Sequence, residues 1–150
     1  MTSVFIKSSE KKDIIKELNE QFGISELPYL LIESGKEKIR AFSGSLSKEE
    51  IIEVGSMANV EGVGIYLLKK EDTGIRPSFD ALMLLKEQIN KNILDIDDKQ
   101  LELWIRGKDL ELNIPAGVYA IRNNNDFFGC GKSNGKILFN YVPKERRLKK

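Results

Sequence analysis

Histidine is absent from the 150-residue sequence, and cysteine occurs only once, at Cys130. Histidine is the commonest metal ligand and the side chain that most readily exchanges protons near neutral pH. Counting alone therefore excludes a zinc site built from cysteine and histidine, and a nucleophile of the Cys–His type. One cysteine cannot form an internal disulfide, which suits a reducing compartment. We expect a protein that is not an enzyme, without catalytic residues, cofactor or metal.

Long apolar segments are also missing. No run approaches the length of a membrane span, and the first residues, MTSVFIKSSEKKD, lack the apolar core of a signal peptide. We therefore expect a cytoplasmic protein that does not enter a membrane. The chain is 41% hydrophobic and 31% charged, which is typical of a globular protein with one domain or two small ones.

The charge is balanced overall but uneven along the chain. The net charge is +1, yet the residues from Gly129 onward carry seven Lys or Arg against one acid, Glu145, or about +6. The residues before Gly129 must then carry about −5, since +1 minus +6 is −5. Such a basic end either binds a polyanion or is simply a solvated tail.

The first half mixes helical and strand-like patterns. Apolar residues recur at helical spacing over residues 9–22, where Ser9 can cap a helix and Gly23 can end it. Strands are expected over residues 29–33, 38–42 and 62–68, and a capping box at Ser47–Glu50 predicts a short helix to about residue 57. Gly62 and Gly64 lack the Lys-Ser/Thr ending of a phosphate loop, which favours close backbone packing over a nucleotide site. The polar run 69–74 is the expected domain boundary.

The second half begins with helices and ends in strands. Ser78 can cap a helix that reaches Ile89, and Gly107 can end a second helix over residues 98–106. Strands are expected over residues 110–112, 118–122, 127–132 and 136–142. Short strands with tight turns predict a small barrel, in which Gly129 and Gly131 indicate a bulge or corner.

One acidic cluster, formed by Asp95, Asp97 and Asp98, is the only candidate for binding a hard cation or for acid–base chemistry. Its spacing does not match a calcium loop, which needs more oxygen ligands at alternating positions. Capping of the following helix by Asp97 or Asp98 is the better interpretation, because acids favour a helix N-terminus.

Three segments together resemble the PUA domain, a small RNA-binding pseudo-barrel named after pseudouridine synthase and archaeosine transglycosylase. They are RGKDL at 106–110, PAGVY at 115–119 and DFFGCGK at 126–132. Pro77-Ser78, GCGK at 129–132 and PKERR at 143–147 are similar to the C-terminal PUA-like domain of Sun-family rRNA cytosine-C5 methyltransferases. Residues 29–70 more faintly resemble the α/β domain that precedes the PUA module in the Nip family of ribosome-biogenesis factors.

This resemblance implies an α+β protein with a small N-terminal α/β (pre-PUA-like) domain, residues 1–73, and a C-terminal PUA-like β pseudo-barrel, residues 74–150. It also implies a non-catalytic protein that binds rRNA or tRNA during maturation, modification or ribosome biogenesis. The methyltransferases' Rossmann half, glycine-rich methyl-donor loop and paired catalytic cysteines have no counterpart here. An accessory subunit that binds a modification enzyme or a ribosome-assembly factor is the alternative.

RNA binding needs cations for phosphates and planar groups for bases. The candidate contacts are Arg106, Lys108, Lys132, Lys136, Lys144, Arg146 and Arg147. Arg106 and Lys108 are chosen because the matching loop of PUA domains faces RNA, and a cation that satisfies the helix dipole is an equal interpretation of Arg106. Aromatic residues in barrel strands are usually core, and Tyr141 is the one expected to be exposed. We expect residues 143–147 to be fixed at the barrel edge.

Overall fold

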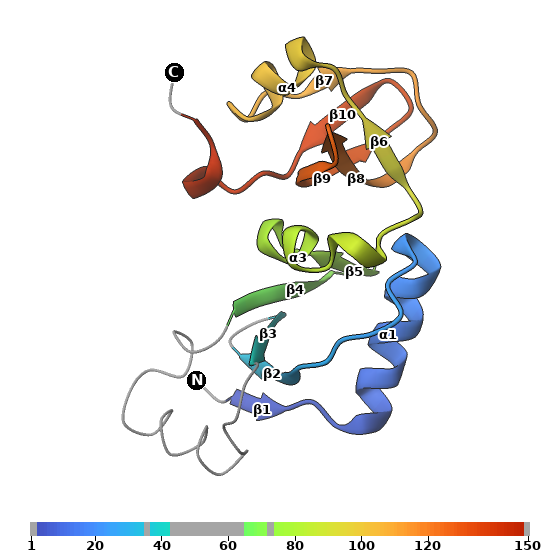
Figure 1. The fold of residues 1–150 in the computed structure, drawn as a ribbon, viewed down its shortest axis with the longest axis vertical. Coiled ribbons are helices and arrows are strands. Elements are labelled where there is room, and N and C mark those ends of the chain that lie inside the picture. The colour runs from blue at the N-terminus through green and yellow to red at the C-terminus, as the bar shows by residue number, and fades with distance from the viewer. Residues whose placement is uncertain (1–2, 35–36, 43–64, 72–73, 149–150) are drawn as a thin grey trace.

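The computed structural model describes residues 3–34, 37–42, 65–71 and 74–148, and it contains two five-stranded sheets (Figure 1). The first sheet and helix α1 lie at one end of the molecule, and the second sheet lies at the other, with helix α3 between them. The predicted capping box at Ser47, its helix, and the glycines at 62 and 64 lie outside the described residues.

The first sheet is an antiparallel meander in the order β1-β2-β3-β4-β5. Its strands are β1 (Ser3–Phe5), β2 (Leu30–Ser34), β3 (Lys38–Phe42), β4 (Ile65–Glu71) and β5 (Gly74–Pro77). The strands predicted over residues 29–33 and 38–42 are confirmed to within one residue. Strands β1 and β5 were not expected, because three or four residues carry too little periodicity.

Helix α1 (Ser8–Phe22) packs against this sheet through the side chains that the helical spacing indicated, Ile14, Leu18 and Phe22. Gly23 ends the helix with a positive φ of 84°, and its N–H donates to the carbonyl of Asn19. The expected cap at Ser9 is wrong. Lys7 occupies the N-cap position and makes no side-chain capping bond.

A β-bulge between β3 and β4 sets which side chains face outward. Arg40 pairs with Tyr66 and Ile39 pairs with Leu68, so that β4 contains one extra residue, Leu67. The extra residue lets the consecutive Leu67 and Leu68 both be buried, although successive side chains of a regular strand alternate. Arg40 and Tyr66 are thereby left together on the outer face.

Strand β5 and helix α3 (Phe79–Leu84) connect the two halves. The boundary predicted at residues 73/74 falls between β4 and β5, which pair in the same sheet, so the first sheet extends to Pro77. Ser78 caps α3 as predicted, accepting a hydrogen bond of 3.0 Å from the N–H of Ala81. The expected helix to Ile89 stops earlier and continues only as the 3-10 turn η2 (Lys86–Gln88).

The second sheet has the order β6-β8-β9-β10-β7, in which β6 and β8 are parallel and the other pairs antiparallel. Its strands are β6 (Ile93–Asp95), β7 (Leu110–Glu111), β8 (Gly117–Asn123), β9 (Asp126–Ser133) and β10 (Ile137–Asn140). The strands predicted from residue 110 onward are all present, although β10 ends two residues early, and β6 was missed. Gly129, with a φ of 79°, lies where the β8–β9 register shifts, which confirms the predicted bulge.

Two clusters of buried side chains form the core. The first joins α1, the first sheet and α3 to Ala120, Phe127 and Cys130 of the second sheet. The second surrounds Trp104 of helix α4 (Asp98–Trp104), which closes one side of the second sheet. Because the first cluster contains residues of both sheets, burial of apolar surface fixes their mutual position.

All three acids of the predicted cluster have structural roles. The side chain of Asp97 caps α4 in a capping box with Gln100, as expected. Asp95 forms an ion pair with Arg122, which lowers the pKa of the Asp95 carboxyl. Asp98 accepts a hydrogen bond of 3.1 Å from Asn123. Among the residues that the structure describes, no group of His, Cys, Asp or Glu could hold a metal ion.

Candidate nucleic-acid interface

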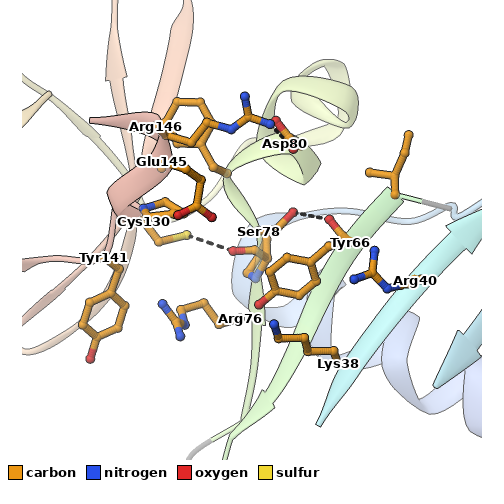
Figure 2. Close-up of a pocket in the computed structure, with 15 residues that line it drawn as sticks. Lys38, Arg40, Tyr66, Arg76, Ser78, Asp80, Cys130, Tyr141, Glu145 and Arg146 are labelled. Carbon is orange, nitrogen blue, oxygen red and sulfur yellow. Dashed lines mark hydrogen bonds and ion pairs between the residues drawn. The ribbon is translucent and has the colours of Figure 1, made fainter. Parts of the chain in front are cut away.

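A groove of about 510 Å³ lies where the first sheet meets the end of the chain (Figure 2). Strands β3, β4 and β5 supply one side and residues 129–146 supply the other, and Ser78, Phe79 and Asp80 at the start of α3 complete the lining. Among the described residues its charged lining consists of four cations and two acids, namely Lys38, Arg40, Arg76, Arg146, Asp80 and Glu145. The lining therefore carries a net charge of about +2, since four minus two is two.

The cations of the sheet side follow from its register. Lys38 of β3 is opposite Lys69 of β4, and Lys69 is opposite Arg76 of β5, so that three cations form one row across three strands. Directly opposed side chains share a face of the sheet, and like charges in that position repel. Glu71, at 2.9 Å from Arg76, offsets part of this repulsion.

Two aromatic rings lie beside these cations. The guanidinium of Arg76 lies 4.4 Å from the centroid of the Tyr141 ring, and the Nζ atom of Lys38 lies 5.2 Å from that of Tyr66. Burial raises the pKa of the Tyr66 phenol, so its hydroxyl stays protonated at neutral pH. The Nε atom of Arg76 is buried and makes no hydrogen bond within the described part of the chain.

The other end of the groove has no excess of positive charge, because Arg146 is accompanied there by Asp80 and Glu145. Arg146 forms an ion pair of 2.7 Å with Asp80, and its guanidinium lies 6.0 Å from the centroid of the Phe79 ring. Figure 2 shows Arg146 and Asp80 facing each other above Cys130, away from Lys38 and Arg40. Anions are therefore attracted most strongly to the sheet side.

Cys130, which lines the groove, lies in a buried setting that disfavours a nucleophilic thiolate. The thiol is 3% exposed and lies 3.9 Å from the carbonyl oxygen of Pro77. Burial raises its pKa to about 12, so the thiolate is scarce at neutral pH.

Three of the seven predicted contacts, Arg106, Lys108 and Arg147, lie at the end of α4, and two more precede Arg147 in the chain. Gly107, with a φ of 90°, ends the helical turn, and Arg106 and Lys108 flank it. The side chain of Arg147 crosses this glycine so closely that a Cβ there would lie 2.6 Å from its Cδ atom. Lys144 and Arg146 precede Arg147 in the 3-10 turn η3 (Lys144–Arg146).

These five cations differ in whether their charged groups already have a partner within the protein. Lys108 and Lys144 are exposed, whereas Arg106 is 3.3 Å from Glu102 in an i,i+4 ion pair. Arg146 is paired with Asp80, and the Nε atom of Arg147 donates to the carbonyl of Val142 at 2.9 Å. Lys108 and Lys144 are thus the most available to a phosphate.

The remaining two, Lys132 and Lys136, belong to the β9–β10 hairpin. Lys132 is opposite Phe139 in the hairpin. Lys136 is in the Asn-Gly turn, and its backbone N–H donates a hydrogen bond to the side-chain oxygen of Asn134. Phe139 is the exposed aromatic residue of this region, at 38%, while Tyr141 is half-buried against Arg76. The expectation that Tyr141 is the exposed one is therefore wrong.

The end of the described chain is held in place. The N–H of Leu148 donates to the carbonyl of Ile105 at 2.8 Å, and Arg147 and Arg146 make the contacts given above. The expectation that residues 143–147 are fixed at the barrel edge is confirmed, and the backbone of Leu148 is hydrogen-bonded as well.

Sequence reasoning missed Lys38, Arg40 and Arg76. Each lies in a short strand of alternating pattern, in which an outward cation is the ordinary solvated residue. Only the strand register, including the bulge at Leu67, brings them together. The sole signal in the sequence is that Lys38 and Arg40 are two residues apart, on one face of a strand.

Comparisons with known proteins identify the second half of the fold. Residues 91–148 match the family model of the methyltransferase RsmF PUA domain. A solved structure of a conserved PUA domain protein from Thermoplasma acidophilum is similar over 97% of both chains, with a TM-score of 0.63 and 14% sequence identity. No curated protein sequence matches the chain. The chain therefore contains a PUA-like domain in a mixed helix-and-strand fold.

Proposed function

We propose that this protein binds RNA through its PUA-like domain and acts, without catalysing a reaction itself, in the maturation or modification of rRNA or tRNA. The observation that carries the proposal is the PUA-like domain at residues 91–148. PUA domains generally bind RNA, and the chain's excess of positive over negative charge lies from Gly129 onward, in that domain's last strands and C-terminal segment.

The arrangement of the cations supports the proposal. The end of α4 and the segment that follows β10 lie side by side, held by the contacts of Gly107 with Arg147 and of Ile105 with Leu148. Cations on a rigid surface lose little conformational freedom when they bind phosphates. A flexible solubilising tail does not need such contacts.

The biological setting follows from the resemblances. The PUA-like domain is similar to one that accompanies an rRNA methyltransferase core, and residues 29–70 resemble the domain that precedes the PUA module in ribosome-biogenesis factors. An RNA undergoing modification or assembly is therefore the substrate class that fits. Among the described residues, no helix is long and apolar enough to cross a membrane.

Fluorescence anisotropy of labelled RNA with the full chain at low salt tests this function. We expect binding that weakens as salt is added, because phosphate contacts release counterions. The double variant Lys108→Ala/Lys144→Ala should bind about tenfold more weakly with a smaller salt slope. The matched control, Lys12→Ala/Lys16→Ala on the outer face of α1, should bind as the wild type does. Absence of RNA affinity in the wild type at low salt overturns the proposal.

A further inference from the structure

We propose that the groove between the first sheet and the PUA-like domain is a nucleotide pocket, which receives one unpaired nucleotide of the bound RNA. Its phosphate lies against Lys38, Arg40 and Arg76, and its base extends the stack formed by Arg76 and Tyr141. This inference rests on the proposed function and adds a second contact surface, one side of which belongs to the first sheet and lies outside the PUA-like domain.

The charge row motivates the phosphate subsite. The row formed by Lys38, Lys69 and Arg76 places three like charges side by side, an arrangement that lowers the stability of a sheet. Lys38 and Arg76, the two ends of this row, line the groove together with Arg40, and a phosphate bound there offsets the repulsion. Charge-assisted hydrogen bonds to guanidinium and ammonium groups are among the strongest available. Glu71 neutralises only one of the three charges.

The planar stack motivates the base subsite. Unpaired bases of RNA stack on aromatic rings and on arginine guanidinium planes. The 4.4 Å separation of the Arg76 guanidinium from the Tyr141 ring places both kinds of surface in one stack. A duplex cannot use it, because its bases are paired and stacked on each other.

The size of the groove fits one nucleotide. Its volume of about 510 Å³ lies within the range of pockets that bind small molecules, about 300–1,000 Å³. A protonated Tyr66 hydroxyl beside Lys38 adds a hydrogen-bond donor to the phosphate side.

The pocket is continuous with the cations at the end of α4. Pro143, Glu145 and Arg146 line the groove, while the adjoining Arg147 covers Gly107. The segment 143–147 therefore borders both surfaces, and an RNA strand that contacts Lys144 and Lys108 can reach the groove across it.

Binding of a short single-stranded RNA, and of a duplex of the same length, tests the pocket by fluorescence anisotropy. We expect Arg76→Gln and Tyr141→Ala to weaken single-strand binding about tenfold and to leave duplex binding unchanged. Tyr141→Phe keeps the ring and should bind as the wild type does. Arg122→Gln is the matched control, since Arg122 is also paired with one carboxylate, Asp95 at 2.7 Å, and lies outside the groove.

A substitution at a solvent-exposed position distinguishes loss of binding from loss of folding. Lys38→Glu changes a solvent-exposed side chain and should weaken single-strand binding at least as much as Arg76→Gln. Arg76→Gln should also lower the slope of log affinity against log salt by about 0.7, the value for one phosphate contact on a single strand. Circular dichroism of each variant checks the fold.

The outcomes separate the pocket from RNA binding itself. If the wild type binds RNA and the groove variants bind it equally well, the pocket is overturned and the RNA-binding function stands. If the wild type binds no RNA, both proposals fail. A titration with adenosine monophosphate distinguishes the source of the nucleotide. Groove-dependent binding of that free nucleotide without RNA binding would overturn the assignment to an RNA strand.

Discussion

The indole ring of Trp104 occupies the space that a side chain at Gly131 would need. A Cβ atom at position 131 would lie 2.7 Å from the Cη2 atom of the ring and 3.0 Å from the side chain of Leu138. The ring is fully buried, and its Nε1–H donates to the carbonyl of Phe128 at 2.7 Å. Helix α4 is therefore fixed to β9 by one large side chain packed against a glycine.

This packing predicts that Gly131→Ala destabilises the protein by about 1–3 kcal/mol, the usual cost of overpacking a core. Gly131 does not have a positive φ, so the cost is steric. Urea unfolding followed by circular dichroism measures it.

A double-mutant cycle tests the cause. Phenylalanine lacks the Cη2 atom, so Gly131→Ala should cost clearly less in a Trp104→Phe background than in the wild type. An equal cost in both backgrounds would show that Trp104 is not what excludes the Cβ.

The two glycines of β9 show which structural roles could be predicted from the sequence and which could not. Their presence in one strand correctly predicted a bulge, but only the structure separates their roles. Gly129 supplies a positive φ at the bulge, and Gly131 supplies space for a ring 27 residues away in the chain. Helix ends and caps depend on residues close together in the chain, so the roles of Gly23, Ser78 and Asp97 could be predicted.

Features that depend on register could not be predicted in the same way. The groove brings β3 and β5 next to residues 129–146, and the pairing of short strands is fixed by bulges and distant packing. For the same reason Arg40 and Arg76 were missed, whereas the cations near Gly107 could be inferred from a family resemblance. The parallel strand β6 was overlooked because three residues before a helix cap give no periodic signal.

The buried thiol of Cys130 should be unreactive in the folded protein. With a pKa raised to about 12, only about one thiol in ten thousand is ionised at mildly alkaline pH, and the group is also shielded from solvent. A chromogenic disulfide reagent should react fully in denaturant and negligibly in its absence. Rapid labelling of the native protein would contradict the packing of β9 against Pro77.

The ammonium of Lys70 ties three elements together. Its Nζ atom lies 2.7 Å from Glu10 of α1 and 2.9 Å from Glu33 of β2. The hydrogen bond to Glu10 is the main cause that raises the pKa of Lys70 above its usual 10.5. These side chains are about one-third exposed, so we expect Lys70→Met to cost only about 1 kcal/mol at neutral pH.

The pH dependence of that cost has a definite sign. Because the folded pKa of Lys70 is raised, its stabilising contribution is fully present below 10.5 and is lost as the pH rises through the folded value. The difference in unfolding free energy between wild type and Lys70→Met should therefore be constant from neutral pH up to 10.5 and shrink above it. Urea titrations across the alkaline range measure it, and a difference that grows with pH would refute the ion-pair account.

Arg147 and Lys144 should respond differently to truncation, although they are three residues apart in one basic segment. Arg147 is half-buried across Gly107 and donates to the carbonyl of Val142, so Arg147→Ala should lower the melting temperature by about 2–4 °C, equivalent to about 1 kcal/mol. Lys144 is exposed, and Lys144→Ala should leave the melting temperature unchanged.

A lysine at position 147 sharpens this test. It keeps the charge but lacks the planar fork whose Nε–H reaches Val142, so Arg147→Lys should not restore the stability. If Arg147→Lys melts like the wild type, the charge alone is what matters and the segment is not held by that hydrogen bond. Lys144→Ala should weaken RNA binding at unchanged stability, because a phosphate contact requires a cation that the fold has not already used.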